Sequence, residues 1–100
     1  MKTITVNQRA SSFAEDKDVA AEIRESDLRP TLRDGKKLRL DFRGVEGATQ
    51  SFVHAMISDL IRREGPAVLD RIEFKNCNAS VRSVIEIVVE YSQLGDNDSA

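Results

Sequence analysis

The hydrophobic and polar positions of this chain follow two different periods. In three short segments, at 3–6, 37–42 and 70–75, apolar residues recur at every second position, which is the period of a half-buried β-strand. The segment 37–42 is the clearest, because its apolar and charged residues alternate strictly. The sequence therefore predicts three strands in one chain.

Segments between these strands carry the three- and four-residue spacing of helices. The first, from about 12 to 26, begins behind serines and carries acidic residues in its early turns. A separate short helix is expected over 27–34, because Pro30 suits the first turn of a helix and breaks its interior. The segment 49–64 has the broadest apolar face, and Gly65 ends it.

The last segment, 80–94, fits both periods, since its β-branched residues alternate and also recur at helical spacing. Its length favours a helix, as do Asn78 or Ser80 as a cap and Gly95 as a stop. We expect a helix here, although the pattern alone also allows a strand. Residues 96–100 are predicted to form a disordered polar tail.

The order of these elements predicts the fold class. Alternating strands and helices favour a small layered α/β domain over residues 1–95, with a sheet of three or four strands, parallel or mixed. About three to four helices would cover this sheet. In such domains the functional side chains usually lie in the loops at the carboxyl ends of the strands. In this chain, residues 43–51 follow the central strand and are the expected location.

Composition narrows the class of protein. The chain has 100 residues, 40% of them apolar, and 15 basic against 17 acidic side chains, which suits one soluble core. It has no apolar run long enough for a membrane span or a signal peptide, and Cys77 is its single cysteine. We therefore expect a cytoplasmic protein in a reducing compartment.

Charge favours a protein partner over nucleic acid. The net charge of −2 gives no general attraction to a polyanion. The stretch 29–43 is locally basic, but acidic residues interrupt it and it lacks interleaved aromatic residues. We expect a protein surface to be the partner of this stretch.

Two hydroxyl groups, those of Thr49 and Ser51, lie at the predicted start of the helix 49–64. Free N–H groups and the helix dipole favour an anion there, so a phosphate could bind or be attached at this point. The alternative is that one hydroxyl simply caps the helix. Gly44 and Gly47 do not form a phosphate-binding loop, because no Gly-Lys-Ser/Thr follows them.

Ser51 and His54 lie three residues apart on one helical face, which allows a second reading, a small hydrolase or ligand-binding enzyme. The pair lacks a nucleophile elbow and an obvious orienting acid, so an exposed histidine is the favoured interpretation. One histidine and one cysteine, far apart in sequence, make no metal-ligand pattern. The sequence predicts no catalytic residue, no metal and no cofactor.

The segments LDFRGVE at 40–46 and ATQSF at 48–52 resemble the signature of the STAS-like domains of unknown function. Residues 23–32 and 72–76 show a weaker similarity to the same family, and together the matches extend over about 19–92. These domains are related to STAS domains, which are named for sulphate transporters and anti-sigma-factor antagonists.

The resemblance implies a small α/β module, of bacterial type, that binds proteins and performs no chemistry. In the antagonists, a histidine-kinase-like ATPase phosphorylates a serine at the start of the helix after the central strand, and this changes the choice of partner. Aligned without gaps, Gln50 occupies the place of that serine, so Thr49 or Ser51 would have to take its role.

The partner implied is therefore a histidine-kinase-like ATPase or an anti-sigma factor, and no membrane is involved. Self-association through an exposed strand edge or helix face is compatible with this function. The residues that we expect to contact a partner surround the helix start: Arg43, Gly44, Glu46, Gly47, Gln50 and His54.

Overall fold

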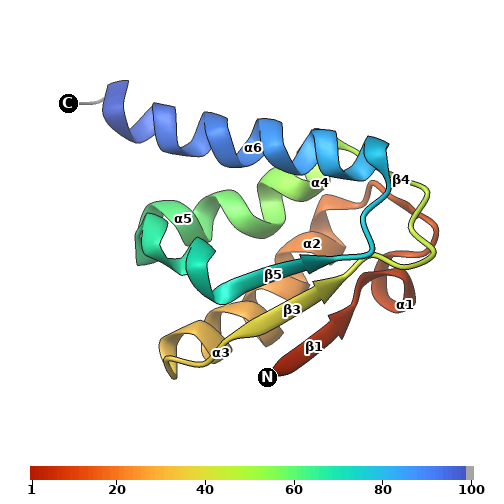
Figure 1. The fold of residues 1–100 in the computed structure, drawn as a ribbon, viewed down its shortest axis with the longest axis horizontal. Helices are drawn as coiled ribbons and strands as arrows, with labels where there is room; N and C mark the ends of the chain where they lie inside the picture. Colours follow the sequence, from red (N-terminus) through yellow and green to blue (C-terminus); the bar gives the residue numbers. More distant parts are fainter. Residues whose placement is uncertain (99–100) are drawn as a thin grey trace.

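The computed structural model describes residues 1–98, and its centre is a parallel sheet. Within these residues three strands pair in the order β1 (Lys2–Thr5), β3 (Leu38–Asp41) and β5 (Ile72–Lys75), all parallel. Figure 1 shows them side by side, with their carboxyl ends at one edge of the domain. The three predicted strands and the α/β class are confirmed.

The longest part of the crossover from β1 to β3 is one continuous helical segment. It comprises α2 (Lys17–Ile23), a π-helical turn η1 (Arg24–Leu28) and α3 (Arg29–Arg33). The predicted break near residue 27 was wrong. In a regular α-helix the ring of Pro30 would clash with the backbone carbonyl four residues earlier. The π turn just before Pro30 is wider and makes room for the ring, so the helix continues past the proline.

The start of this helix also differs from the prediction. Asp16, rather than Ser11 or Ser12, caps it, because the carboxylate of Asp16 accepts a hydrogen bond from the N–H of Asp18 at 2.9 Å. Residues 11–16 instead connect the short helix α1 (Val6–Ala10) to α2. Val6, predicted as the end of the first strand, is the first residue of α1.

The crossover from β3 to β5 repeats the same construction. It comprises α4 (Gln50–Val53), a second π-helical turn η2 (His54–Ser58) and α5 (Asp59–Glu64). As predicted, this helix ends at Gly65, which has φ +95°. A 3-10 turn, η3 (Pro66–Arg71), then leads into β5.

The ambiguous last segment is a helix, α6 (Ala79–Asp98), and it packs across α4, η2 and α5. Asn78 caps it, since its side-chain oxygen accepts a hydrogen bond from the N–H of Val81 at 2.8 Å. The helix passes Gly95, the predicted stop, and extends to Asp98. The disordered tail expected over 96–100 remains a prediction. Residues 99–100 lie outside the described part of the chain.

Two very short strands were missed by the sequence pattern. β2 (Phe13–Ala14) and β4 (Gly47–Ala48) pair in parallel as a separate two-stranded sheet. β4 lies within residues 43–51, the segment after the central strand in which no strand was expected. Two residues are too few to display a period, so only the tertiary pairing reveals these strands.

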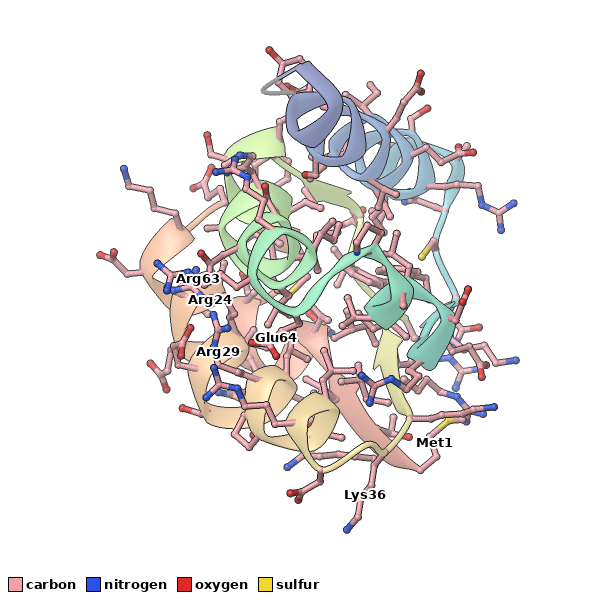
Figure 2. The ribbon with its side chains drawn as sticks, turned by 90° about the vertical axis from the view of Figure 1, so that its left-hand side faces the viewer. Met1, Arg24, Arg29, Lys36, Arg63 and Glu64 are labelled. Carbon is pink, nitrogen blue, oxygen red and sulfur yellow. The ribbon has the colours of Figure 1, made fainter. Side chains whose placement is uncertain are left out.

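The core lies between one face of the main sheet and the helices. Leu38, Leu40 and Phe42 are fully buried on that face, whereas Arg39 and Asp41 on the other face are partly exposed. Figure 2 shows the side where the two crossover helices meet, with Arg29 and Glu64 between them. Within residues 1–98, no helix is long and apolar enough to cross a membrane.

Candidate functional site

A groove runs between α6 and the start of the helix 50–64. Its volume is about 410 Å³, which lies in the range of ligand and peptide sites in proteins. Its lining combines polar and cationic side chains on one wall with apolar side chains on the other: Lys17, Gln50, Ser51, His54, Ala55, Ile87, Val88 and Tyr91.

The apolar wall of the groove is unusually exposed. Ile87 and Tyr91 lie one turn apart on α6, with exposed fractions of 49% and 71%. Large apolar side chains that line a hollow on the surface mark contact sites more often than isolated ones do. The groove therefore has the character of a binding surface.

The structure separates the two hydroxyls at the helix start. The Oγ1 atom of Thr49 accepts a hydrogen bond from the N–H of Phe52 at 3.1 Å, and Thr49 is half-buried. Ser51 is exposed and lines the groove. Thr49 is thus the helix cap, and Ser51 is the hydroxyl that a second molecule can reach.

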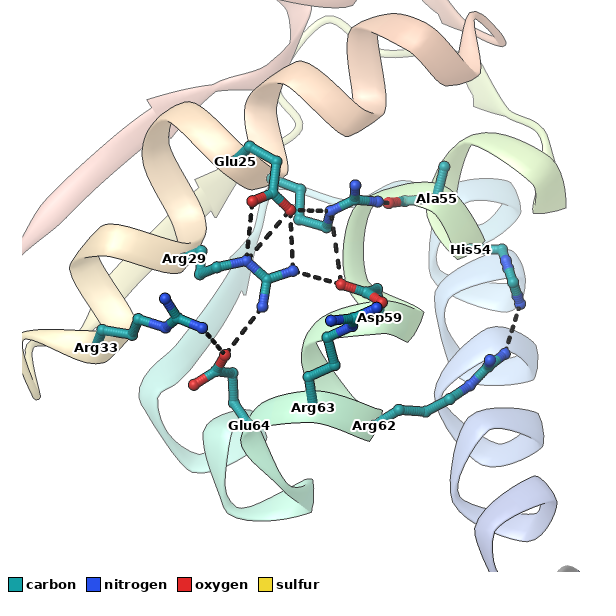
Figure 3. A network of polar contacts seen from close by, with 10 residues as sticks. Glu25, Arg29, Arg33, His54, Ala55, Asp59, Arg62, Arg63 and Glu64 are labelled. Atoms are coloured by element: carbon teal, nitrogen blue, oxygen red, sulfur yellow. Dashed lines mark hydrogen bonds and ion pairs between the residues drawn. The ribbon is translucent and has the colours of Figure 1, made fainter.

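His54 is exposed in the π turn η2, on the same groove wall as Ser51. Its Nε2 atom lies 3.3 Å from Nη2 of Arg62, as Figure 3 shows. Among the described residues, no hydrogen bond joins Ser51 to His54 and no carboxylate orients the ring. The two side chains share a groove without forming the contact that activates a serine.

The loop before the helix supplies further accessible residues. Arg43, Gly44 and Glu46 are exposed, as are Gln50 and His54.

Gly47, however, is buried, and a Cβ atom there would lie 2.8 Å from Cε1 of Phe13. The absence of a side chain at Gly47 allows Phe13 to pack closely against β4, and the expected role of Gly47 as a partner contact remains a prediction.

Asp41, at the end of the central strand, holds this loop in place. Its Oδ1 atom accepts hydrogen bonds from Nδ2 of Asn76 and from the N–H of Arg43, each at 2.9 Å. The hydrogen bond from Asn76 is the main reason that the pKa of Asp41 lies below its usual value. The motif aspartate is therefore a positioning residue for the loop.

An ionic network lies on the opposite side of the helix 50–64, facing the first crossover helix (Figure 3). Arg29 is its centre, with a side chain only 10% exposed. Its guanidinium binds Glu25 and Glu64, each at 2.9 Å, and also Asp59. One arginine thus joins three carboxylates from two helices.

Arg24 connects this network to the groove. Its Nε atom donates to Glu25 at 2.6 Å, and its Nη1 atom donates to the backbone oxygen of Ala55 at 2.6 Å. Ala55 belongs to η2 and lines the groove. The guanidinium of Arg24 therefore binds the π turn that carries His54, on the side of the turn that faces the first crossover helix.

The acidic members of the network are held in their charged form. Hydrogen bonds from Arg29, and then from Arg24, lower the pKa of Glu25 to about 2. Burial raises the pKa of Asp59, but hydrogen bonds from Arg29 and Arg63 outweigh it, so the pKa lies below its usual value. Glu25 and Asp59 are therefore ionised at neutral pH.

The sequence analysis missed this network. The spacing of Glu25 and Arg29, four residues apart on a helix, could have indicated one ion pair. Asp59 and Glu64 are 30 and 35 positions away from Arg29 in the sequence, so no local pattern relates them.

The described residues include no group of three or more side chains that could hold a metal ion. Cys77 is partly buried after β5, and burial raises the pKa of its thiol. A thiol with a raised pKa has less of the reactive thiolate form at neutral pH.

Residues 19–82 match the family described as the STAS-like domain of unknown function (DUF4325). Since this match covers more than half of the chain, the protein belongs to that family. No curated protein and no solved structure matches the chain. The matched region contains β3, β5, the helix 50–64 and most of the first crossover helix, whereas β1 and most of α6 lie outside it.

Proposed function

We propose that this chain is a cytoplasmic, non-enzymatic regulatory module that binds a protein partner, and that phosphorylation of Ser51 changes its choice of partner. The enzyme that adds the phosphate would be a histidine-kinase-like ATPase. The alternate target would be a protein of the anti-sigma-factor type.

One observation carries the proposal: an exposed hydroxyl, Ser51, lies at the start of a long helix inside a groove with uncovered apolar side chains. A phosphate there adds about two negative charges, which the helix N-terminus and Lys17 can accommodate. The same charge would alter a groove in which an unmodified partner packs on Ile87 and Tyr91. One modification thereby favours one partner and disfavours another.

The geometry also favours Ser51 over Thr49 as the modified residue. Thr49 is half-buried and its hydroxyl oxygen already accepts the hydrogen bond that caps the helix. A phosphate on Thr49 would disturb this cap, whereas a phosphate on Ser51 leaves it intact.

The test is to incubate the purified chain with a histidine-kinase-like ATPase from the same genome, Mg²⁺ and ATP. Intact-protein mass spectrometry should show addition of one phosphoryl group, lost in Ser51→Ala and kept in Thr49→Ser, which retains the cap. Modification that persists in Ser51→Ala, or neither complex nor modification, contradicts the proposal.

The same variants test the enzyme alternative. Hydrolysis of a small activated ester above the buffer rate, abolished in both Ser51→Ala and His54→Gln, would replace the regulatory module with a hydrolase. We expect the wild-type chain and both variants to give the buffer rate.

A further inference from the structure

The outer edge of β5 is open. Within the described residues, β5 pairs with β3 on one side and with no strand on the other. The carbonyl of Lys75 accepts from the N–H of Phe42 at 2.9 Å, so the backbone groups of Lys75 point toward β3. Because neighbouring residues of a strand direct these groups to opposite sides, the N–H and carbonyl of Phe74 and the carbonyl of Ile72 point to the open edge. The N–H of Ile72 instead donates to the carbonyl of Leu69.

Two adjoining hollows lie between this edge and α6, with volumes of about 320 and 440 Å³. They share Phe74, Ile85 and Glu86, so they adjoin each other along the strand, and we refer to the two together as the channel. The remaining lining residues are Cys77 and Arg82 at one end, and Leu69, Val89 and Glu90 at the other.

The floor of this channel is apolar but incompletely covered. Leu69, Phe74, Cys77 and Val89 are partly buried side chains that pack against the core and still face solvent. Side chains from an added strand would cover them, because alternate residues of such a strand point to the same face.

The rim of the channel is acidic. Glu86 and Glu90 are exposed and lie one turn apart on α6. In the described part of the chain neither carboxylate forms an ion pair. Glu90 shares the hollow with Leu69, while Arg82 lies at the other end with Cys77, so the negative charge is concentrated toward the start of β5.

The other edge strand of the sheet is different. The hollow near β1 is lined mainly by polar and charged residues, among them Lys2, Asp34 and Lys36. Met1 and Pro30 are its only apolar lining residues, whereas the hollows beside β5 are lined by Leu69, Phe74, Ile85 and Val89. Charged residues beside an edge usually discourage pairing, so β5 is the edge that is suited to bind a segment.

We propose that the open edge of β5 and the channel beside α6 bind an extended segment of a protein partner. This segment is about four to six residues long and alternates apolar residues with lysine or arginine. Its backbone pairs with the N–H and carbonyl of Phe74 and with the carbonyl of Ile72. Its apolar side chains cover Phe74 and Leu69, and its cations meet Glu86 and Glu90. This surface lies on the other flank of α6 from the Ser51 groove, so it does not depend on the proposed function.

The experiment compares two hexapeptides with blocked termini on the full chain, one alternating lysine with valine and one alternating glutamate with valine. We expect the lysine peptide to bind at least about tenfold more tightly by calorimetric titration, because of the acidic rim. It should shift the amide resonances of Ile72 and Phe74, and should slow alkylation of Cys77 by N-ethylmaleimide. The same lysine peptide with proline in place of valine, which cannot donate, should bind weakly.

Charge reversal on α6 sharpens the test. The double variant Glu86→Lys with Glu90→Lys should lose the lysine peptide and gain the glutamate peptide. The control Glu15→Lys with Glu22→Lys has the same change of charge at exposed positions outside the channel and should bind like the wild type. Far-UV circular dichroism checks that both variants are folded. If either variant is unfolded, the comparison of the lysine and glutamate peptides on the wild-type chain tests the proposal.

Three results would overturn the proposal. These are no binding of the lysine peptide, equal binding of both peptides, or amide shifts confined to the Ser51 groove. Dimerisation of the chain in sedimentation analysis, with β5 amides protected by the second copy and no peptide binding, would assign the edge to self-association instead. Ser51→Ala should leave peptide binding unchanged, which keeps this test independent of the phosphorylation test.

Discussion

The two sides of the helix 50–64 differ in how their polar groups are satisfied. On the side that faces the first crossover helix, Arg29 binds three carboxylates, and the side chain of Glu64 is only 18% exposed. On the groove side, Ser51 is exposed and the neighbouring Ile87 and Tyr91 are uncovered. One helix therefore has an ionic side, whose polar groups are paired within the chain, and a groove side, whose polar and apolar groups are exposed.

This difference indicates what each side does. Polar groups that are paired and shielded hold helices together, and they offer little to a second molecule. The exposed hydroxyl beside uncovered apolar side chains has no hydrogen-bond partner within the described part of its own chain, and a second protein can supply that partner and cover the apolar surface. We therefore assign stability to the ionic side and recognition to the groove side.

The largest expected effect comes from removing the centre of the ionic side. Arg29→Met should lower the free energy of unfolding by about 3 kcal/mol, because Glu64 and Asp59 lose their shared cation at a place that is largely shielded from water. Urea denaturation measures this change. The matched control is Arg63→Met, whose side chain is 73% exposed and whose pair with Asp59 should be worth less than about 1 kcal/mol. Equal losses in the two variants would remove the distinction between the shielded and the exposed pairs.

The groove side should show the opposite behaviour. Tyr91→Ala should change the free energy of unfolding by less than about 0.5 kcal/mol, since the side chain is mostly exposed. It should weaken binding of the regulatory partner about tenfold or more, because exposed aromatic side chains often dominate contact energies. Ser83→Ala, at an exposed position on α6 outside the groove lining, serves as the control. Loss of stability in Tyr91→Ala without loss of binding would reverse the assignment.

The two hydroxyls at the helix start provide a smaller contrast. Thr49→Ala should destabilise the chain by about 1 kcal/mol through loss of the cap, whereas Thr49→Ser should retain most of the stability. Ser51→Ala should have little effect on unfolding. Thermal or urea unfolding of the three variants measures the contrast, and a Ser51→Ala loss equal to that of Thr49→Ala would contradict the assignment of the cap.

The smallest effect is expected from acid. Hydrogen bonds to arginine lower the pKa of Glu25 from 4.5 to about 2, so the unfolded chain binds a proton more readily than the folded chain between these values. Stability from this group is complete above the unfolded pKa and is lost as the pH falls toward 2. Urea midpoints measured across this range should fall less steeply in Glu25→Gln, in which the group no longer titrates. The effect is modest because Glu25 is half exposed.

Much of the fold could be predicted from the sequence. The strands at 38–41 and 72–75 and the helix start at Thr49 follow from local periods and capping residues, which act over a few positions. The break expected before Pro30 did not occur, because a π turn accommodates the proline while the helix stays packed on its neighbour. Local propensity indicated a stop, and tertiary packing outweighed it.

The site was predictable in part. Thr49, Ser51 and His54 were found from sequence, since they lie within six residues of each other. Ile87 and Tyr91 were assigned only to a helix, because their place beside Ser51 depends on how α6 crosses the helix 50–64. No sequence signal distinguished the capping hydroxyl from the exposed one.

The sequence by itself determined the alternation of strands and helices, the positions of the main turns and the family resemblance, because periodicity, caps and motifs are local properties. The tertiary structure alone decided that Arg29 meets carboxylates from a second helix, that Gly47 is buried under Phe13, and that α6 forms one wall of the groove. These contacts join residues far apart in the chain, and their geometry depends on how the helices pack. That packing separates one closed side of the helix 50–64 from the open side on which we expect a partner to bind.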